Sequence, residues 1–276
     1  MKKNELFEAI KVTKSFLCVG LDPDLTLVPS RFNTAVKLFD FLKAIIDSTA
    51  DFCVAFKLNL AFFESLGPPG YTLYEKVLAY IPQRHLVIAD AKRGDIGNSS
   101  IQYADAFFGR SGEASRVDAL TVNPYMGKDS IIPFLAHKDK WTIVLALTSN
   151  AGASDFQLLK LAEGSAVYEK VLQESSTWGT PDQVMFVIGA TRPDMLASVR
   201  KIVPDHFLLI PGVGAQGGSL HDVCRDGWTS FCGLLVNSGR SILYASSGSD
   251  FDLAAAREAR SLQLEMESII AQKSVY

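Results

Sequence analysis

The feature that most constrains the fold of this 276-residue chain is the alternation of short apolar runs with longer amphipathic segments. Eight apolar runs are typical of buried strands: SFLCVGLD, DFCVAFKLN, HLVIADAK, DALTVNPY, WTIVLALTS, QVMFVIGAT, HFLLIPGVG and FCGLLVNSGR. Segments between them, including 35–50, 71–81, 129–138 and 165–176, carry apolar residues at helical spacing. Strands that are apolar throughout belong to parallel sheets covered by helices, so we expect an α/β fold, a (β/α)8 TIM barrel.

An open, doubly wound sheet is the alternative architecture. A dinucleotide-binding sheet of that kind would carry a GxGxxG turn after its first strand, whereas this chain has Asp22 and Asp24 there. No linker, low-complexity tract or shift in composition divides the sequence. We therefore expect residues 1–276 to form a single domain.

The net charge, the apolar runs and the cysteine spacing indicate which classes of binding partner and which cellular location to expect. The formal net charge of −3 provides no global basic field for a nucleic-acid polymer or an anionic membrane. Glu5 and Glu8 interrupt the N-terminal segment where a signal peptide needs an apolar core, and no run approaches membrane-spanning length. The four cysteines stand singly in apolar runs, without the spacing of a metal site. We expect a cytoplasmic protein with reduced cysteines and no structural metal.

Polar side chains follow the first three apolar runs, just where each run ends. Asp22 closes the first, Lys57 and Asn59 close the second, and Asp90 and Lys92 close the third. The carboxyl ends of barrel strands carry active sites, and strand alternation assigns Asp90 and Lys92 to one face. A purely structural ion pair is a weak explanation, because burying charges is costly. We interpret them as site residues; for Asp22 and Asn59 a turn cap is the alternative.

Two glycine-rich turns near the end of the sequence are typical of a phosphate site. Residues 210–218, IPGVGAQGG, leave the seventh strand, and residues 236–243, VNSGRSIL, leave the eighth with Arg240 at a helix start. Backbone N–H groups freed by glycine can bind a dianion, and an arginine adds a bidentate contact. The sequence therefore predicts a phosphomonoester site. Arg93, which alternates away from Lys92, is interpreted as a solvated charge at the rim.

The order Lys57, Asp90, Lys92, Asp95 alternates cation and anion. A substrate carboxylate placed against Asp90 would be crowded by like charge, and loss of CO2 would relieve the crowding. The ammonium of Lys92 could then stabilise and protonate the carbanion, with Lys57 and Asp95 fixing its position. These residues predict decarboxylation without a cofactor.

The motif DAKRGDIGNS resembles the DxKxxDI signature of the orotidine 5'-phosphate decarboxylase family, and its KRGDIG form resembles the type 2 bacterial branch. GLDPD, FKLN, LTSNAG, IPGVGAQGG and VNSGRSILYA also occur in family order. The resemblance implies cofactor-free conversion of orotidine 5'-phosphate to UMP in de novo pyrimidine biosynthesis. It further implies that Lys92 is the proton donor, that Asp90 faces the substrate carboxylate, and that Lys57 bridges the charges and the ribose.

The same resemblance implies a homodimer with shared active sites, in which Asp95 and Ser99 reach the neighbouring subunit's site. The substrate, a pyrimidine nucleoside monophosphate, would be bound by Asp22, Ser99, Ser149, Pro211, Gly214, Ala215, Gln216 and Arg240. Asp22 and Ser99 would hold the ribose, Ser149 the pyrimidine edge and Pro211 its ring. Gln216 would reach from phosphate to base, and the phosphate would lie on Gly214, Ala215 and Arg240.

Two alternatives remain open from the sequence. Magnesium-dependent sugar-phosphate decarboxylases and synthases of the same superfamily share DxKxxD, but they carry a carboxylate where this chain has Lys57. A catalytically silent phosphate-binding barrel is the other alternative. Such a barrel should have lost one of Lys57, Asp90 or Lys92, and this chain keeps all three.

Overall fold

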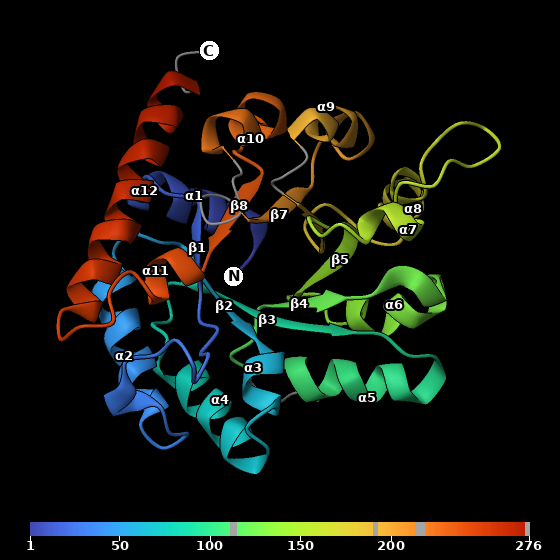
Figure 1. Cartoon of the computed structure of the whole chain (residues 1–276). Coiled ribbons are helices and arrows are strands. Elements are labelled where there is room, and N and C mark those ends of the chain that lie inside the picture. The colour runs from blue at the N-terminus through green and yellow to red at the C-terminus, as the bar shows by residue number, and fades with distance from the viewer. Residues whose placement is uncertain (111–114, 190–192, 213–218, 274–276) are drawn as a thin grey trace. The chain divides into compact units, whose positions relative to one another are not determined.

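All eight predicted strands are present, and they close into a barrel in sequence order (Figure 1). The computed structural model describes residues 1–110, 115–189, 193–212 and 219–273. The strands are β1 (Leu17–Gly20), β2 (Ala55–Asn59), β3 (Leu86–Arg93), β4 (Ala119–Val122), β5 (Trp141–Leu147), β6 (Val184–Ile188), β7 (Phe207–Pro211) and β8 (Leu234–Ser238). The predicted (β/α)8 barrel is confirmed, and the alternative of an open sheet is wrong.

Helices separate the strands, as the apolar spacing predicts. They are α1 (Lys3–Thr13), α2 (Leu38–Thr49), α3 (Leu60–Glu64), α4 (Pro68–Tyr80), α5 (Gly97–Phe108), α6 (Lys128–Leu135), α7 (Ala153–Phe156), α8 (Val167–Ser175), α9 (Pro193–Ile202), α10 (Leu220–Gly227), α11 (Arg240–Leu243) and α12 (Phe251–Lys273), with 3-10 turns η1 (Ser30–Phe32) and η2 (Pro124–Met126). Helix α4 begins three residues before the predicted segment 71–81, because the fixed φ of proline suits the first turn of a helix.

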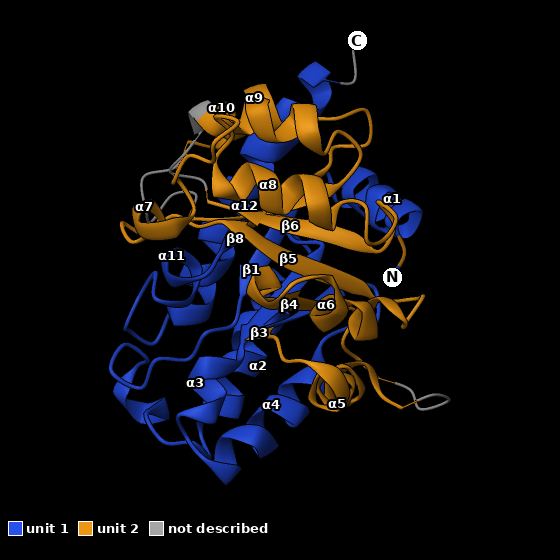
Figure 2. Ribbon diagram, turned by 90° about the vertical axis from the view of Figure 1, so that its right-hand side faces the viewer, with its two compact units in different colours: residues 1, 3–91, 237–276 blue, residues 2, 92–236 orange. Residues whose placement is uncertain are grey.

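The first and last segments of the chain belong to one compact unit. Unit 1 comprises residues 3–91 and 237–276, together with residue 1, and is blue in Figure 2. Within it, α12 packs against α2. Phe251 of α12 stacks on Phe41 of α2 with ring centroids 5.3 Å apart. These two buried rings join the core of the N-terminal segment to that of the C-terminal one.

Unit 2 comprises residues 92–236, together with residue 2, and is orange in Figure 2. Strands β4, β5, β6 and β7 pair in parallel in that order. Arg200 of α9 ties the segments before β7 and β8 together with its guanidinium. That group donates hydrogen bonds of 2.6–3.1 Å to the carbonyls of Gly227, Val203, His206 and Gly233.

Three further expectations from the sequence concern the cysteines, membrane-spanning helices and the number of domains. The four cysteines are free and buried, as expected for packing residues. Across the described ranges, no helix is long and apolar enough to cross a membrane. The assignment of residues 1–276 to a single domain stays a prediction.

Candidate active site

Lys57 lies between two carboxylates at the carboxyl ends of β1, β2 and β3. Its Nζ is 3.4 Å from Oδ1 of Asp22 and 3.3 Å from Oδ2 of Asp90. The side chain of Lys57 is only 5% exposed, and that of Asp90 11%. The parallel register places Asn59 of β2 beside Asp90 of β3, so Lys57 and Asp90 come from neighbouring strands. The sequence-predicted grouping of Asp22, Lys57 and Asp90 is therefore present in unit 1.

The electrostatics of Lys57 are dominated by burial and by its two carboxylate partners. Burial alone would lower the pKa of Lys57, but attraction to Asp22 and Asp90 outweighs it, so the pKa is raised and the ammonium stays charged. Burial raises the pKa of the neighbouring Cys18 thiol to about 12, which keeps the thiol neutral. The cluster therefore holds a charged ammonium against the carboxylates of Asp22 and Asp90.

The loop after β1 is held in place by three hydrogen bonds. The amide of Asn59 donates to Oδ1 of Asp22 at 3.2 Å. Tyr244 Oη donates to the carbonyl of Asp22 and accepts from the amide of Asp24, both at 2.7 Å. Asn59 also caps α3 by accepting from the amide of Ala61, which is the alternative that the sequence left open. Tyr244 was not predicted, because no sequence pattern links the end of α11 to this loop.

Arg240 lies in the same unit as Asp22 and begins α11, where its side chain is exposed. The turn before it lies against the end of β1. A Cβ on Gly20 would be 3.1 Å from the Cα of Gly239, and one on Gly239 would be 3.9 Å from Oδ2 of Asp22. A side chain at Gly20 would therefore be in tight contact with Gly239, whereas one at Gly239 would be at ordinary contact distance from Asp22. The remaining predicted phosphate and base contacts, Gly214, Ala215 and Gln216, lie outside the described residues.

Lys92 stands at the end of β3 in a strained conformation. Its φ of +50° is in the left-handed region, which costs a non-glycine residue roughly 1–2 kcal/mol. Its amide donates to Oγ1 of Thr121 at 2.9 Å. The alternation that assigned Asp90 and Lys92 to one face applies to extended backbone, and Lys92 is not extended. Their shared face therefore stays a prediction.

The residues after Lys92 turn toward α5. Asp95 is half-buried, and its Oδ1 accepts from the amide of Ile96 at 2.8 Å, while Ser99 is exposed in the first turn of α5. Arg93 differs from the solvated charge that was expected. Its guanidinium lies over the rings of Tyr103 and Phe107, 5.7 and 5.8 Å from their centroids, as cation–π contacts require.

Ser149 and Pro211 complete the predicted set. Ser149 follows β5 and Pro211 ends β7, and both are half-buried. Gly189 lies against Ser149 so closely that a Cβ there would be 2.7 Å from the serine amide nitrogen. This contact fixes the position of the Ser149 backbone within unit 2.

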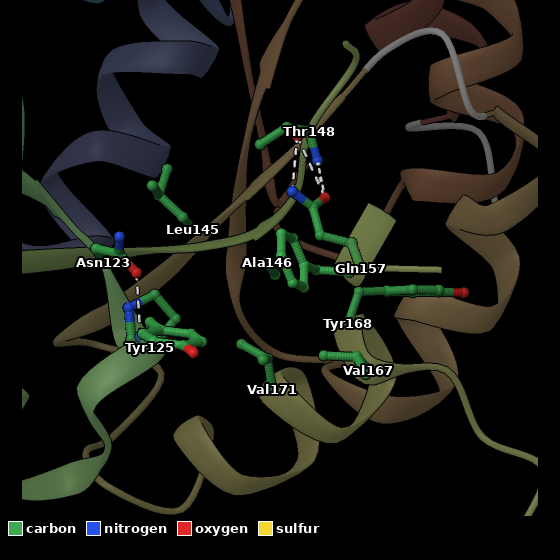
Figure 3. Close-up of a pocket in the computed structure, with 11 residues that line it drawn as sticks. Asn123, Tyr125, Leu145, Ala146, Thr148, Gln157, Val167, Tyr168 and Val171 are labelled. Atoms are coloured by element: carbon green, nitrogen blue, oxygen red, sulfur yellow. Dashed lines mark hydrogen bonds between the residues drawn. The ribbon is translucent and has the colours of Figure 1, made fainter. Parts of the chain in front are cut away.

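A cavity of about 340 Å³ opens near the end of β5 (Figure 3). Thr148 and Gln157, whose side chains are hydrogen-bonded to each other, are among the residues that line it. The lining is largely apolar, and consists of Asn123, Pro124, Tyr125, Leu145, Ala146, Thr148, Phe156, Gln157, Val167, Tyr168 and Val171. No predicted site residue is among these, although Ser149 is the next residue after Thr148.

Comparison with known proteins identifies close relatives. A family model described as the orotidine 5'-phosphate decarboxylase / HUMPS family matches residues 15–250. An orotidine 5'-phosphate decarboxylase of Phocaeicola vulgatus is 50% identical, with 99% of this chain and 100% of that protein covered. One of Porphyromonas gingivalis is 51% identical, with 100% of both covered. The solved Leishmania donovani OMP decarboxylase is 33% identical with a TM-score of 0.80, over 96% of this chain and 99% of that one.

Proposed function

The chain belongs to the orotidine 5'-phosphate decarboxylase / HUMPS family, and from this premise we propose how its residues carry out the reaction. The family description covers two activities, and the relatives at about half identity over the full length bear the name of the decarboxylase. The chain is thus a carboxy-lyase that converts orotidine 5'-phosphate to UMP in pyrimidine biosynthesis.

The observation that carries the mechanism is the buried ammonium of Lys57 between Asp22 and Asp90. Asp90 is the member of this cluster that lies at the carboxyl end of β3, where a substrate carboxylate would be placed. Asp90 would therefore crowd a substrate carboxylate electrostatically in the ground state, and loss of CO2 removes that repulsion. Lys57 holds both carboxylates in position through direct contacts.

In the second half of the reaction, Lys92 acts on the carbon that has lost CO2. The ammonium of Lys92 stabilises the carbanion as it forms and then donates a proton to C6, which gives UMP. Asp95 balances the charge of Lys92. Support for Lys92 in this role comes from its position two residues after Asp90 on β3 and from its strained backbone, since strained residues gather at functional sites.

Substrate contacts follow the ends of several strands. Asp22, fixed by the amide of Asn59 and by Tyr244, binds ribose hydroxyls, and Arg240 binds the phosphate. The proposed base contacts are Ser149 and Pro211. The proposal also assigns Gln216 to the base and phosphate, and Gly214 and Ala215 to the phosphate; these three residues lie outside the described ranges.

The active form is proposed to be a cytoplasmic homodimer with shared sites. Asp95 and Ser99 are each taken to enter the site of the neighbouring subunit. Exposed apolar side chains next to them support an interface here, since Ile96 is 60% and Ile101 45% exposed. Isologous contact between two copies would cover these side chains.

The test is a spectrophotometric assay that follows the absorbance of orotidine 5'-phosphate, with and without EDTA. We expect the absorbance to fall at the same rate in both samples. Turnover that EDTA abolishes would favour the magnesium-dependent alternative. No turnover in either sample, by protein that still binds UMP, would favour the catalytically silent barrel.

A further inference from the structure

Residues 92–94, at and just after the end of β3, lie against Thr121 of β4 and against Asn123, the residue that follows β4. The amide of Lys92 donates to Oγ1 of Thr121 at 2.9 Å, and the carbonyl of Arg93 accepts from the amide of Asn123 at 2.8 Å. At Gly94 the two backbones approach so closely that a Cβ would be 3.0 Å from the carbonyl oxygen of Asn123. The backbone on both sides of Lys92 is therefore held. The Thr121 side chain accepts from the Lys92 amide, and the Asn123 amide donates to the carbonyl of the next residue, Arg93.

Thr121 is well suited to hold one backbone conformation. Its side chain is buried, at 1% exposure, and its β-branch restricts χ1, so Oγ1 has a fixed position in β4. A fixed acceptor at 2.9 Å favours the orientation of the Lys92 amide that goes with a φ of +50°. A left-handed residue persists only where its surroundings favour it over the extended form.

We propose that Thr121 is a positioning residue of the reaction. Its hydroxyl holds the backbone of Lys92 in the left-handed conformation, and this conformation sets the direction in which the lysine side chain leaves the strand. The inference rests on the proposed function, in which the ammonium of Lys92 protonates the substrate carbon. Thr121 itself touches no substrate atom in this proposal.

The decisive comparison is between Thr121→Val and Thr142→Val. Thr142, in β5, is also 1% exposed, and its hydroxyl has no hydrogen-bond partner within the described residues. Both changes replace a buried hydroxyl by a methyl group in a strand of unit 2. We expect Thr121→Val to lower kcat about 10- to 100-fold while KM and the Kd of UMP stay within about threefold of wild type. Thr142→Val should leave all three constants unchanged.

Thr121→Ser retains the acceptor and should recover most of the lost kcat. If Thr121 had a purely structural role, Thr121→Val would lower the thermal midpoint but would not lower kcat selectively while KM stayed near the wild-type value. Equal kcat values for Thr121→Val and Thr142→Val would overturn the inference. If Thr121→Val does not fold, Thr121→Ser and Thr121→Ala are compared instead, and equal kcat values in that pair also overturn it.

The same assay distinguishes failure of the proposed function from failure of the Thr121 inference. Wild-type protein that does not consume orotidine 5'-phosphate contradicts the proposed function and, with it, this inference. Wild-type turnover together with full activity of Thr121→Val contradicts the inference alone.

Discussion

The hydroxyl of Tyr244 donates a hydrogen bond to the backbone carbonyl of Asp22 across 2.7 Å, although 222 residues separate the two in the chain. The same oxygen accepts from the amide of Asp24, so the tyrosine holds the loop after β1 on both sides of Pro23. The carboxylate of Asp22 is in turn set against Lys57. Helix α11, which begins with Arg240, thus ends in contact with the loop that carries the proposed ribose contact.

Tyr244→Phe should weaken substrate binding more than it slows turnover. The change removes both hydrogen bonds and keeps the ring, so we expect a loss of about 1–2 kcal/mol in the free energy of unfolding. KM should rise severalfold, because the loop that carries Asp22 is released. Urea unfolding and steady-state kinetics measure the two effects. Tyr80→Phe, which removes an exposed hydrogen bond to Asp47 in the same unit, is the control and should leave KM unchanged.

Tyr244 should also make stability depend on alkaline pH. Burial raises its pKa from 10.0 to about 12. The folded protein therefore keeps the phenol proton at pH values where the unfolded chain has lost it. This contribution is complete below about pH 10 and is lost as the pH rises toward 12. The difference in unfolding free energy between wild type and Tyr244→Phe should stay constant up to about pH 10 and shrink as the pH rises from 10 toward 12; a difference that stays constant over that range would contradict the assignment.

Lys92→Ala should abolish turnover while the protein stays folded. The change removes the proposed proton donor and the cation nearest to the developing charge. The substitution should not stabilise the protein by relieving backbone strain, because alanine, like lysine, is disfavoured at a φ of +50°. Circular dichroism checks the fold and the absorbance assay the rate. Appreciable decarboxylation by this variant would mean that another group donates the proton.

Arg240→Ala should weaken binding of UMP by about 2–4 kcal/mol, the range for losing a charge-assisted contact to a ligand. It should also lower kcat/KM, since phosphate binding energy contributes to orientation of the reacting end. Titration calorimetry with UMP measures the affinity. Arg257→Ala, an exposed arginine of α12 in the same unit, is the matched control. Equal affinities of the two variants for UMP would remove Arg240 from the phosphate site.

Mixing two inactive variants tests whether subunits share their sites. In a dimer of Lys92→Ala with Asp95→Ala, one site combines both lesions and the other has intact Lys92 and Asp95. With random exchange, half the dimers are mixed, so activity should return to roughly a quarter of wild type. Subunit exchange is verified by mass-labelled chains. If exchange occurs and activity does not return, Asp95 acts within its own chain.

The strand order and the cluster around Lys57 were predictable from the sequence. Apolar runs report burial, and the carboxyl ends of parallel strands meet at one edge, so the polar residues that close those runs gather there. Asp22, Lys57 and Asp90 follow directly from this rule. Their separations and the raised pKa of Lys57 required the structure.

The devices that hold the site were not predictable. The left-handed backbone of Lys92 depends on a hydroxyl 29 residues further along, and the loop of Asp22 depends on Tyr244. Periodicity reports the face on which a residue lies, not the partner of its amide or hydroxyl. Arg93 shows the same limit, since its two aromatic partners lie on the following helix.

The division of unit 1 between residues 3–91 and 237–276 has a consequence for biosynthesis. A ribosome completes the whole of unit 2 before it makes the second part of unit 1. Until then, Phe41 of α2 lacks Phe251, its stacking partner, and presents an apolar surface to solvent. Asp22 is synthesised early, yet Tyr244, which holds the loop that carries it, is made only after unit 2 is complete. A nascent chain stalled before α11 would therefore be a client for chaperones rather than a partly active enzyme.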